Sequence, residues 1–306
     1  MQMRVLILGA GAVGLSIAAK LSDYAEVFAV CRDRCAAAIR KDGFSLTGLW
    51  EKETFQLPCG TVPPAGPWDY IIITTKSLAT RSICEQYHHL FGDAEVVSLQ
   101  NGIGNEEIIS EYTDNVIGGM IITGFEWMAD NAVFVSVDGG ETVFGRFPGG
   151  QDEKADILAR LFAKAGMRAS STENIKGTIW AKALYSCSLN PLGAIMECSY
   201  GDLLQTPAWN IITKIVQEAF EVVNTEGIMM QQKTAEEYLE FLKTRKIPPT
   251  ATHLSSMYQD IAAGRLTEVD YINGAIVTLG KKDGIPTPVN EMIVNLTHFK
   301  EGLKCR

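Results

Sequence analysis

The sequence predicts an α/β domain with a mostly parallel sheet, followed by an all-helical domain. In the first half of the chain, short apolar runs alternate with amphipathic stretches, which is typical of βαβ units. After residue 168 the strand pattern nearly disappears, and residues 174–300 show helical spacing divided by Gly, Pro and Asn. We therefore expect two domains, residues 1–173 and residues 174–306.

Four apolar runs in the first half are predicted strands. These are residues 5–8, 26–30, 70–74 and 96–99, with helical spacing over residues 13–22, 34–41 and 79–90 between them. From residue 116 to residue 147, strand-like runs are separated by Gly and Asp-Gly signals. We expect antiparallel strands there that extend the sheet, with residues 133–147 forming a hairpin.

The composition is that of a globular protein whose cores need neither disulfides nor metal. The 306 residues are 46% hydrophobic and 21% charged, which is enough for two cores. The net charge of -9 offers no broad positive surface, so we expect no nucleic-acid or membrane partner. Seven scattered cysteines without a CxxC pair, and only four histidines, predict reduced thiols and no metal site.

The apolar run at the start of the chain is soon interrupted by glycines. No run reaches the ~18 apolar residues that a membrane helix requires. We therefore expect a cytoplasmic protein. The sequence leaves the oligomeric state open, and a homodimer is compatible with it.

A glycine-rich turn follows the first predicted strand and opens the first predicted helix. Its residues are Gly9, Ala10, Gly11, Ala12, Val13 and Gly14. In this GxGxxG pattern the first glycine permits a tight turn, the second lets backbone N–H groups approach a pyrophosphate, and the third allows close packing of helix on strand. The sequence therefore predicts a Rossmann-type dinucleotide-binding domain. The alternative is a purely structural glycine turn.

The end of the second predicted strand indicates which dinucleotide binds. A site for NAD expects an acidic residue there, which accepts from the ribose 2′-hydroxyl. This chain has Arg32, whose guanidinium suits a 2′-phosphate, and so NADPH is favoured. In the alternative interpretation, Arg32 is a solvated surface residue and Asp33 binds the ribose.

Polar side chains follow the next two predicted strands. Lys76 comes directly after one strand and Asn101 after the other. Open α/β sheets bind ligands at the carboxyl ends of their strands, so both side chains are candidates for the cofactor site. An exposed loop lysine and an Asn-Gly turn are the alternatives.

Lys182, Ser186 and Asn190 lie four residues apart in an apolar stretch with helical spacing, on one face of the predicted helix. Burial lowers the pKa of an ammonium toward the range in which it can donate a proton at neutral pH. Lys182 is therefore a candidate general acid. The alternative is a lysine whose stem packs while its head reaches water.

A third cluster precedes a predicted helix near residue 270. Thr267 and Asp270 have the spacing of a capping box, in which Glu268 merely favours the helix dipole. In a functional interpretation, Glu268 stays ionised and either pairs with Lys182 or accepts from a substrate or ribose hydroxyl. Ser255 and Ser256 lie one helix upstream, where they could donate to a carboxylate.

Taken together, these segments resemble the ketopantoate reductase (2-dehydropantoate 2-reductase) family over nearly the whole chain. The resemblance rests on GAGAVG at 9–14, TTK at 74–76, QNGIG at 100–104, the stretch 182–191, SSMYQD at 255–260, TEVDYING at 267–274 and GIPTPVN at 284–290. The SSMxQD and TExDYING blocks are the most specific part. The resemblance implies a Rossmann domain and a helical domain, with NADPH and substrate in the cleft between them.

The resemblance also implies roles for individual residues. On the cofactor side, Arg32 matches the ligand of the 2′-phosphate, and Lys76 and Asn101 match contacts to cofactor and substrate. Glu268 matches the active-site glutamate, which we assign to catalysis and to cofactor binding. On the substrate side, Lys182 matches the proton donor.

Three further positions complete the implied substrate site. Asn190 and Ser256 match substrate contacts, and Ser186 occupies a position that faces the substrate in the family. Ser186 and Tyr200 stand where the best-known members carry Asn. Serine is shorter and tyrosine is bulkier, so this pocket is a candidate for a different 2-keto acid.

The implied reaction is the NADPH-dependent reduction of ketopantoate to pantoate, on the route to pantothenate and coenzyme A. A paralogous reductase of another 2-keto acid, or an opine-type dehydrogenase, is the first alternative. A non-catalytic NADP(H) sensor is the second. Lys182, Asn101 and Glu268 speak against the sensor, because a sensor needs no buried acid.

Overall fold

A computed structural model describes residues 2–304 of the chain. The chain divides into two compact units, Met1–Gln100 with Asn105–Lys176, and Asn101–Gly104 with Gly177–Arg306. The first unit contains a mostly parallel sheet and the second is helical, which confirms the predicted fold class. None of the helices within residues 2–304 is long and apolar enough to cross a membrane.

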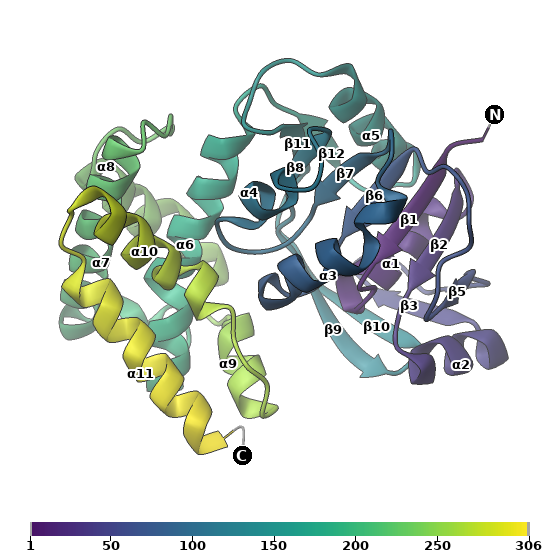
Figure 1. The fold of residues 1–306 in the computed structure, drawn as a ribbon. Helices are drawn as coiled ribbons and strands as arrows, with labels where there is room; N and C mark the ends of the chain where they lie inside the picture. Colours follow the sequence, from purple (N-terminus) through teal and green to yellow (C-terminus); the bar gives the residue numbers. More distant parts are fainter. Residues whose placement is uncertain (1, 305–306) are drawn as a thin grey trace. The chain divides into compact units, whose positions relative to one another are not determined.

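An eight-stranded sheet forms the centre of the first unit (Figure 1). Its strands are β1 (Arg4–Leu8), β2 (Glu26–Val30), β5 (Cys59–Gly60), β6 (Tyr70–Ile73), β7 (Glu95–Ser98), β8 (Val116–Met120), β11 (Thr142–Arg146) and β12 (Ala169–Ser171). Their order is β12-β11-β8-β7-β6-β1-β2-β5, and only β8 and β11 pair antiparallel. Strand order reverses at β1, between β2 and β6, which is where open α/β sheets bind their ligands.

Both faces of this sheet are covered by helices, and successive apolar side chains of β1 point to opposite faces. Val5 and Ile7 belong to one core cluster, and Leu6 and Leu8 belong to another on the opposite face. The first cluster includes residues of α1, α2 and α5, and the second includes residues of α3 and α4. The helix bounds are α1 (Ala12–Leu21), α2 (Asp33–Asp42), α3 (Thr80–Tyr87), α4 (Asn105–Ser110) and α5 (Glu153–Lys164).

A second sheet in the same unit corrects one prediction. It consists of β4 (Glu53–Phe55), β3 (Phe44–Gly48), β10 (Ala132–Asp138) and β9 (Thr123–Ala129), in that order. The expected hairpin over residues 133–147 is wrong, because β10 pairs with β9 and β3 whereas β11 pairs with β8 and β12. The glycines after Asp138 connect two sheets instead of turning a hairpin. A Cβ at Gly139 would lie 2.5 Å from the carbonyl oxygen of Ile122.

Within residues 2–304, six α-helices form the second unit (Figure 1). They are α6 (Ile175–Met196), α7 (Thr206–Thr225), α8 (Ala235–Phe241), α9 (Ser256–Ala262), α10 (Asn273–Asp283) and α11 (Pro288–Lys304). Their apolar residues, among them Leu184, Ile215 and Ile276, share one core. Short helical turns in the two units are η1 (Ser77–Ala79), η2 (His88–Leu90), η3 (Asp202–Leu204), η4 (Leu242–Lys246), η5 (Pro248–Thr250) and η6 (Val269–Tyr271).

Helix α6 contains a proline whose effect is compensated from another helix. Pro191 has no N–H, so the carbonyl oxygen of Cys187, one turn earlier, lacks its helical donor. The buried Asn273 supplies one, since its Nδ2 donates to Cys187 O at 3.2 Å and to Asn290 Oδ1 at 3.0 Å. The asparagine of the TEVDYING block therefore joins α10 to α6 and α11.

We expect Asn273→Ala to lower the free energy of unfolding by about 2–4 kcal/mol. The substitution deprives two buried oxygens of their donor, and each unsatisfied buried group costs ~1–3 kcal/mol. Urea denaturation followed by circular dichroism measures the effect, with Thr278→Ala on the exposed side of the same helix as the control. Equal midpoints for the two variants would contradict this role of Asn273.

Candidate functional site

The glycine-rich turn at the end of β1 requires glycine at two positions. Gly9 has a φ of +74°, and a Cβ there would lie 1.8 Å from Thr75 Cγ2. A Cβ at Gly14 would lie 2.3 Å from Thr74 Oγ1. A side chain at either position would collide with the loop after β6, so only glycine allows the tight turn at Gly9 and the close approach of α1 to the sheet at Gly14.

The middle glycine of the turn faces open space. A Cβ at Gly11 would meet nothing closer than the carbonyl oxygen of Gly9, at 3.9 Å. The N–H of Ala10 donates to Val30 O at 2.8 Å, which fixes the turn against β2. The first turn of α1, from Ala12, carries N–H groups without helical acceptors, so this turn can accommodate an anionic group.

Arg32 lies at the carboxyl end of β2, as the residue that precedes α2. Its side chain is exposed, as is that of Asp33. The neighbouring Arg34 differs, because its guanidinium pairs with Asp130 at 3.2 Å. The arginine that follows the strand is therefore the one of the pair that remains available to an anionic ligand.

A buried polar network shapes the loops that follow β6 and β7. Gln100 Nε2 donates to Thr75 O at 3.0 Å and to Thr80 Oγ1 at 2.8 Å. The Thr80 hydroxyl donates to Asn105 Oδ1 at 2.8 Å. The half-buried Lys76 stands between β6 and η1 in this region. The sequence alone does not indicate this network, because the spacing of these polar residues is that of an ordinary polar loop.

The central finding is a cluster of Lys182, Asn101 and Glu268 in the helical unit. Lys182 Nζ donates to Asn101 Oδ1 at 2.6 Å, and Asn101 Nδ2 donates to Glu268 Oε2 at 3.0 Å. The amide thus lies between an ammonium and a carboxylate and offers each the group that it requires. Three residues separated by up to 167 positions in the chain come together here.

The surroundings of Lys182 change its acidity. Its ammonium is set deep among protein atoms while the residue keeps partial access to solvent. Burial lowers the pKa of Lys182 to about 8, although the negative charge of Glu268 acts in the opposite direction. An ammonium of this kind can give up its proton near neutral pH.

Asn101 reaches this cluster because the segment Asn101–Gly104 belongs to the helical unit. The N–H of Ile103 donates to Tyr271 O at 2.8 Å, and the Ile103 side chain joins the helical core. Gly102 has a φ of +89°, and a Cβ there would lie 2.6 Å from the same Tyr271 oxygen. Glycine at 102 is therefore needed to place Asn101.

Side chains of α11 hold residues on both sides of Glu268. The N–H of Thr267 donates to Glu301 Oε1 at 2.7 Å, and Asp270 Oδ1 lies 2.9 Å from His298 Nε2. His298 Nδ1 contacts Glu301 Oε2 at 2.8 Å. Burial alone would lower the pKa of His298, but the two carboxylates outweigh it and raise that pKa. Asp270 thus binds a histidine and does not complete the expected capping box.

The remaining predicted residues lie in different surroundings. Ser186 is half-buried one turn beyond Lys182 on α6, and Asn190 is buried one turn further. Ser256 is exposed at the start of α9. Its neighbour Ser255 caps that helix and donates to Asn190 O at 3.1 Å. Ser255 is therefore the serine of the pair that contacts the predicted substrate residue.

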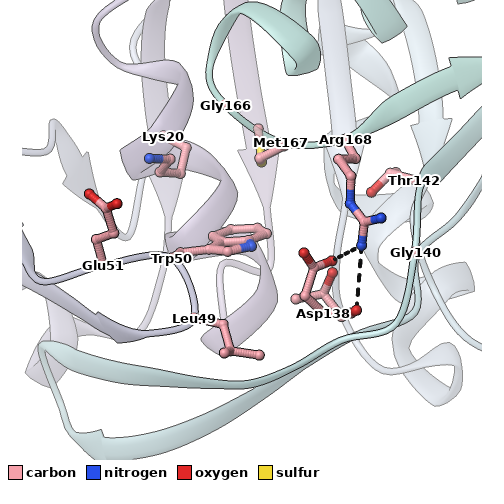
Figure 2. A pocket seen from close by; sticks show the side chains of 11 residues that line it. Lys20, Leu49, Trp50, Glu51, Asp138, Gly140, Thr142, Gly166, Met167 and Arg168 are labelled. Atoms are coloured by element: carbon pink, nitrogen blue, oxygen red, sulfur yellow. Dashed lines mark hydrogen bonds and ion pairs between the residues drawn. The ribbon is translucent and has the colours of Figure 1, made fainter.

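A cavity of about 320 Å³ lies elsewhere, in the first unit, and contains none of the predicted site residues. Figure 2 shows Trp50 between Lys20 and Arg168, with the guanidinium of Arg168 directed toward Asp138. Arg168 Nη2 pairs with Asp138 Oδ1 at 2.9 Å. Oppositely charged side chains therefore neutralise much of this cavity's lining.

The fold and the cluster together define a class of protein, the Rossmann-type oxidoreductases. The chain combines a glycine turn at the end of the first strand of a mostly parallel sheet with a separate helical unit that contains a lysine of lowered pKa. Family profiles are more specific. "Ketopantoate reductase PanE/ApbA" matches residues 5–149, and "Ketopantoate reductase PanE/ApbA C terminal" matches residues 174–301.

Individual relatives agree with these profiles. The 2-dehydropantoate 2-reductase of Pyrococcus horikoshii is 33% identical over 303 residues, which cover 98% of both chains. That of Archaeoglobus fulgidus is 34% identical over 303 residues, covering 97% of this chain and 98% of its own. The chain belongs to the ketopantoate reductase family.

Solved structures show the same fold. The PanE/ApbA family ketopantoate reductase from Ralstonia eutropha JMP134 superposes with a TM-score of 0.89 at 27% identity, over 99% of this chain and 100% of its own. D-mandelate dehydrogenase, solved with NADH and anilino(oxo)acetate, has a TM-score of 0.89 at 28% identity, over 98% of this chain and 99% of its own. The fold therefore occurs in proteins named for different 2-keto or 2-hydroxy acids.

Proposed function

We propose that this protein is an NADPH-dependent reductase that converts ketopantoate (2-dehydropantoate) to pantoate, on the route to pantothenate and coenzyme A. The observation that carries the proposal is the cluster of Lys182, Asn101 and Glu268, with its lysine of lowered pKa. The names of the relatives supply the substrate. A small-molecule substrate and a cytoplasmic location follow from this role.

The first unit, residues 1–173 in our proposal, would hold the cofactor. The open space at Gly11 and the first turn of α1 fit a pyrophosphate, and the exposed Arg32 fits a 2′-phosphate. Lys76, Asn101 and Glu268 are the further proposed contacts. When bound, NADPH supplies the hydride that reduces the C2 carbonyl.

Residues 174–306 would supply the acid and the substrate contacts. As the carbonyl oxygen gains negative charge, the Lys182 ammonium donates its proton to that oxygen and yields the hydroxyl of the product. Asn101 holds this ammonium in place through Oδ1, and its own Nδ2 is held by Glu268. Ser186, Asn190 and Ser256 are the other proposed substrate contacts.

Loss of NADPH absorbance in the presence of ketopantoate tests the cofactor, the reaction class and the substrate together. We expect NADPH-dependent turnover that saturates with ketopantoate, and much slower turnover with NADH as a parallel control. Tight NADPH binding without turnover of any 2-keto acid would contradict the proposal and favour a sensor.

The pH dependence follows from the acidity of Lys182. With a pKa of about 8, roughly nine-tenths of the lysine is protonated at pH 7. We expect kcat/KM to be constant below this pKa and to fall about tenfold per pH unit above it, because the general acid must be protonated. A profile measured at saturating NADPH from about pH 6 to about pH 10 checks this. A flat profile across that range would exclude Lys182 as the acid.

A reductase of another 2-keto acid is the second candidate, and specific observations favour it. Ser186 and Tyr200 stand where the best-known members of the family carry Asn. D-mandelate dehydrogenase, which has a similar fold, is named for an aromatic 2-hydroxy acid. A panel of 2-keto acids separates the two candidates. A kcat/KM higher for another 2-keto acid than for ketopantoate would decide for the second.

A further inference from the structure

We propose that Tyr200 is a positioning residue that fixes the side-chain amide of Asn190, so that this amide presents its N–H groups to an oxygen in the tail of the substrate. The inference rests on the proposed function for the substrate contact of Asn190. It adds a residue and a specificity rule that neither the family profiles nor the names of the relatives contain.

The first observation is the hydrogen bond between the two side chains. The Tyr200 hydroxyl donates to Asn190 Oδ1 at 2.6 Å, and both residues are buried, with 3% and 8% of their surface exposed. This occupies the acceptor of the amide. Among residues 2–304, no side chain or carbonyl accepts from Asn190 Nδ2, so the amide keeps its two donors.

The second observation is that Tyr200 itself is held rigidly. Its ring packs edge-on against Tyr185, with 5.8 Å between ring centroids, and in a tilted arrangement against His253, with 5.2 Å between centroids. Its N–H donates to His253 O at 3.1 Å. The hydroxyl therefore occupies a defined position from which it can direct the amide.

The backbone of Asn190 is fixed as well. Its carbonyl oxygen accepts from Ser255 Oγ at 3.1 Å, and Pro191, the next residue in α6, restricts the backbone of Asn190. With the backbone fixed, rotation of the terminal amide remains the main freedom of Asn190. The Tyr200 hydroxyl disfavours it, since the rotated amide would exchange the donation from the phenol to Oδ1 for a weaker bond in which the phenol accepts from Nδ2.

The position of Asn190 along α6 indicates which part of the substrate it contacts. Lys182 and Asn190 share one helix face but lie eight residues apart, which corresponds to roughly 12 Å along the axis. If the ketone of the substrate binds at the Lys182 ammonium, Asn190 is therefore placed to contact the opposite end of the substrate. Donors at that end select a 2-keto acid whose tail carries an oxygen, such as the hydroxyl of ketopantoate.

The test compares ketopantoate with trimethylpyruvate, which has the same carbon skeleton without the tail hydroxyl. We expect Tyr200→Phe to raise the KM for ketopantoate about tenfold and to leave kcat within about twofold, because a binding contact is weakened. The kcat/KM for trimethylpyruvate should stay unchanged. Tyr185→Phe removes a neighbouring hydroxyl that contacts Thr250, and is the matched control. Equal losses for the two substrates, or unchanged kinetics with ketopantoate, would overturn the inference.

A second measurement needs no substrate and separates this inference from the proposed function. In a double-mutant cycle of Tyr200→Phe and Asn190→Ala, we expect a coupling of about threefold to tenfold in the equilibrium constant for unfolding. Additive effects would overturn the inference even in an enzyme that reduces ketopantoate. If the cycle shows coupling but the wild-type protein does not reduce ketopantoate, the hydrogen bond between Tyr200 and Asn190 stands. The proposed function is then contradicted and, with it, the selection for an oxygen in the substrate's tail.

Discussion

Lys182→Ala should lower kcat by about a hundredfold to ten-thousandfold, the range attributed to a general acid. The lysine is half-buried on α6, with its ammonium deep among protein atoms, its pKa is lowered to about 8, and Asn101 directs the ammonium. Alanine removes the proton donor and leaves water as a poorly placed substitute. The loss should appear at saturating substrate, because the interaction matters chiefly as charge develops on the substrate oxygen.

The affinity for NADPH should change little in the same variant, since the proposed phosphate contacts lie in the first unit. Equilibrium binding of NADPH followed by fluorescence measures this. Lys281→Ala is the matched control, because Lys281 lies exposed on α10 and pairs only with Glu291 among the described residues. Wild-type turnover by Lys182→Ala would refute the role of the lysine, and a loss equal to that of Lys281→Ala would do the same.

Arg32→Ala is the second substitution with a large expected effect. We expect the KM for NADPH to rise about tenfold to a hundredfold, which corresponds to the loss of charge-assisted hydrogen bonds of ~1.5–3 kcal/mol. The KM for NADH should barely change, because NADH carries no 2′-phosphate. Steady-state kinetics with both cofactors at saturating keto acid measures the change in preference.

Arg34→Ala supplies the control for Arg32. It removes a guanidinium from the same turn, but one that pairs with Asp130. We expect this variant to keep the wild-type preference for NADPH. If Arg32→Ala weakened both cofactors equally, Arg32 would be a structural residue.

The fold could be predicted from the sequence where local patterns determine it. The alternation of Val5, Leu6, Ile7 and Leu8 fits a strand buried on both faces, and the structure assigns these residues to two cores. The hairpin over residues 133–147 was mispredicted for a physical reason. An Asp-Gly-Gly sequence permits a tight turn but equally permits a connection between sheets, and only long-range pairing decides between them.

The candidate site divides in the same way. The helical spacing of Lys182, Ser186 and Asn190 was visible in the sequence, and α6 places them on one face. The bridging position of Asn101 was not visible, because it depends on contacts to residues more than 80 positions away. The hydrogen bond of the Tyr200 hydroxyl could not be predicted either, since a tyrosine in an apolar stretch is interpreted as a core residue until the partner of its hydroxyl is known.

The segment Asn101–Gly104 has a consequence for how the molecule can be made. The chain leaves the first unit at residue 101, returns at residue 105 and leaves again at residue 177. A fragment that starts at Gly177 therefore lacks the residue that holds the Lys182 ammonium, and a fragment that ends at Lys176 carries that residue without its partners. During synthesis, Asn101 leaves the ribosome long before Glu268, so the hydrogen bond between the two side chains can form only late. The helical unit is thus assembled from two separate stretches of the chain.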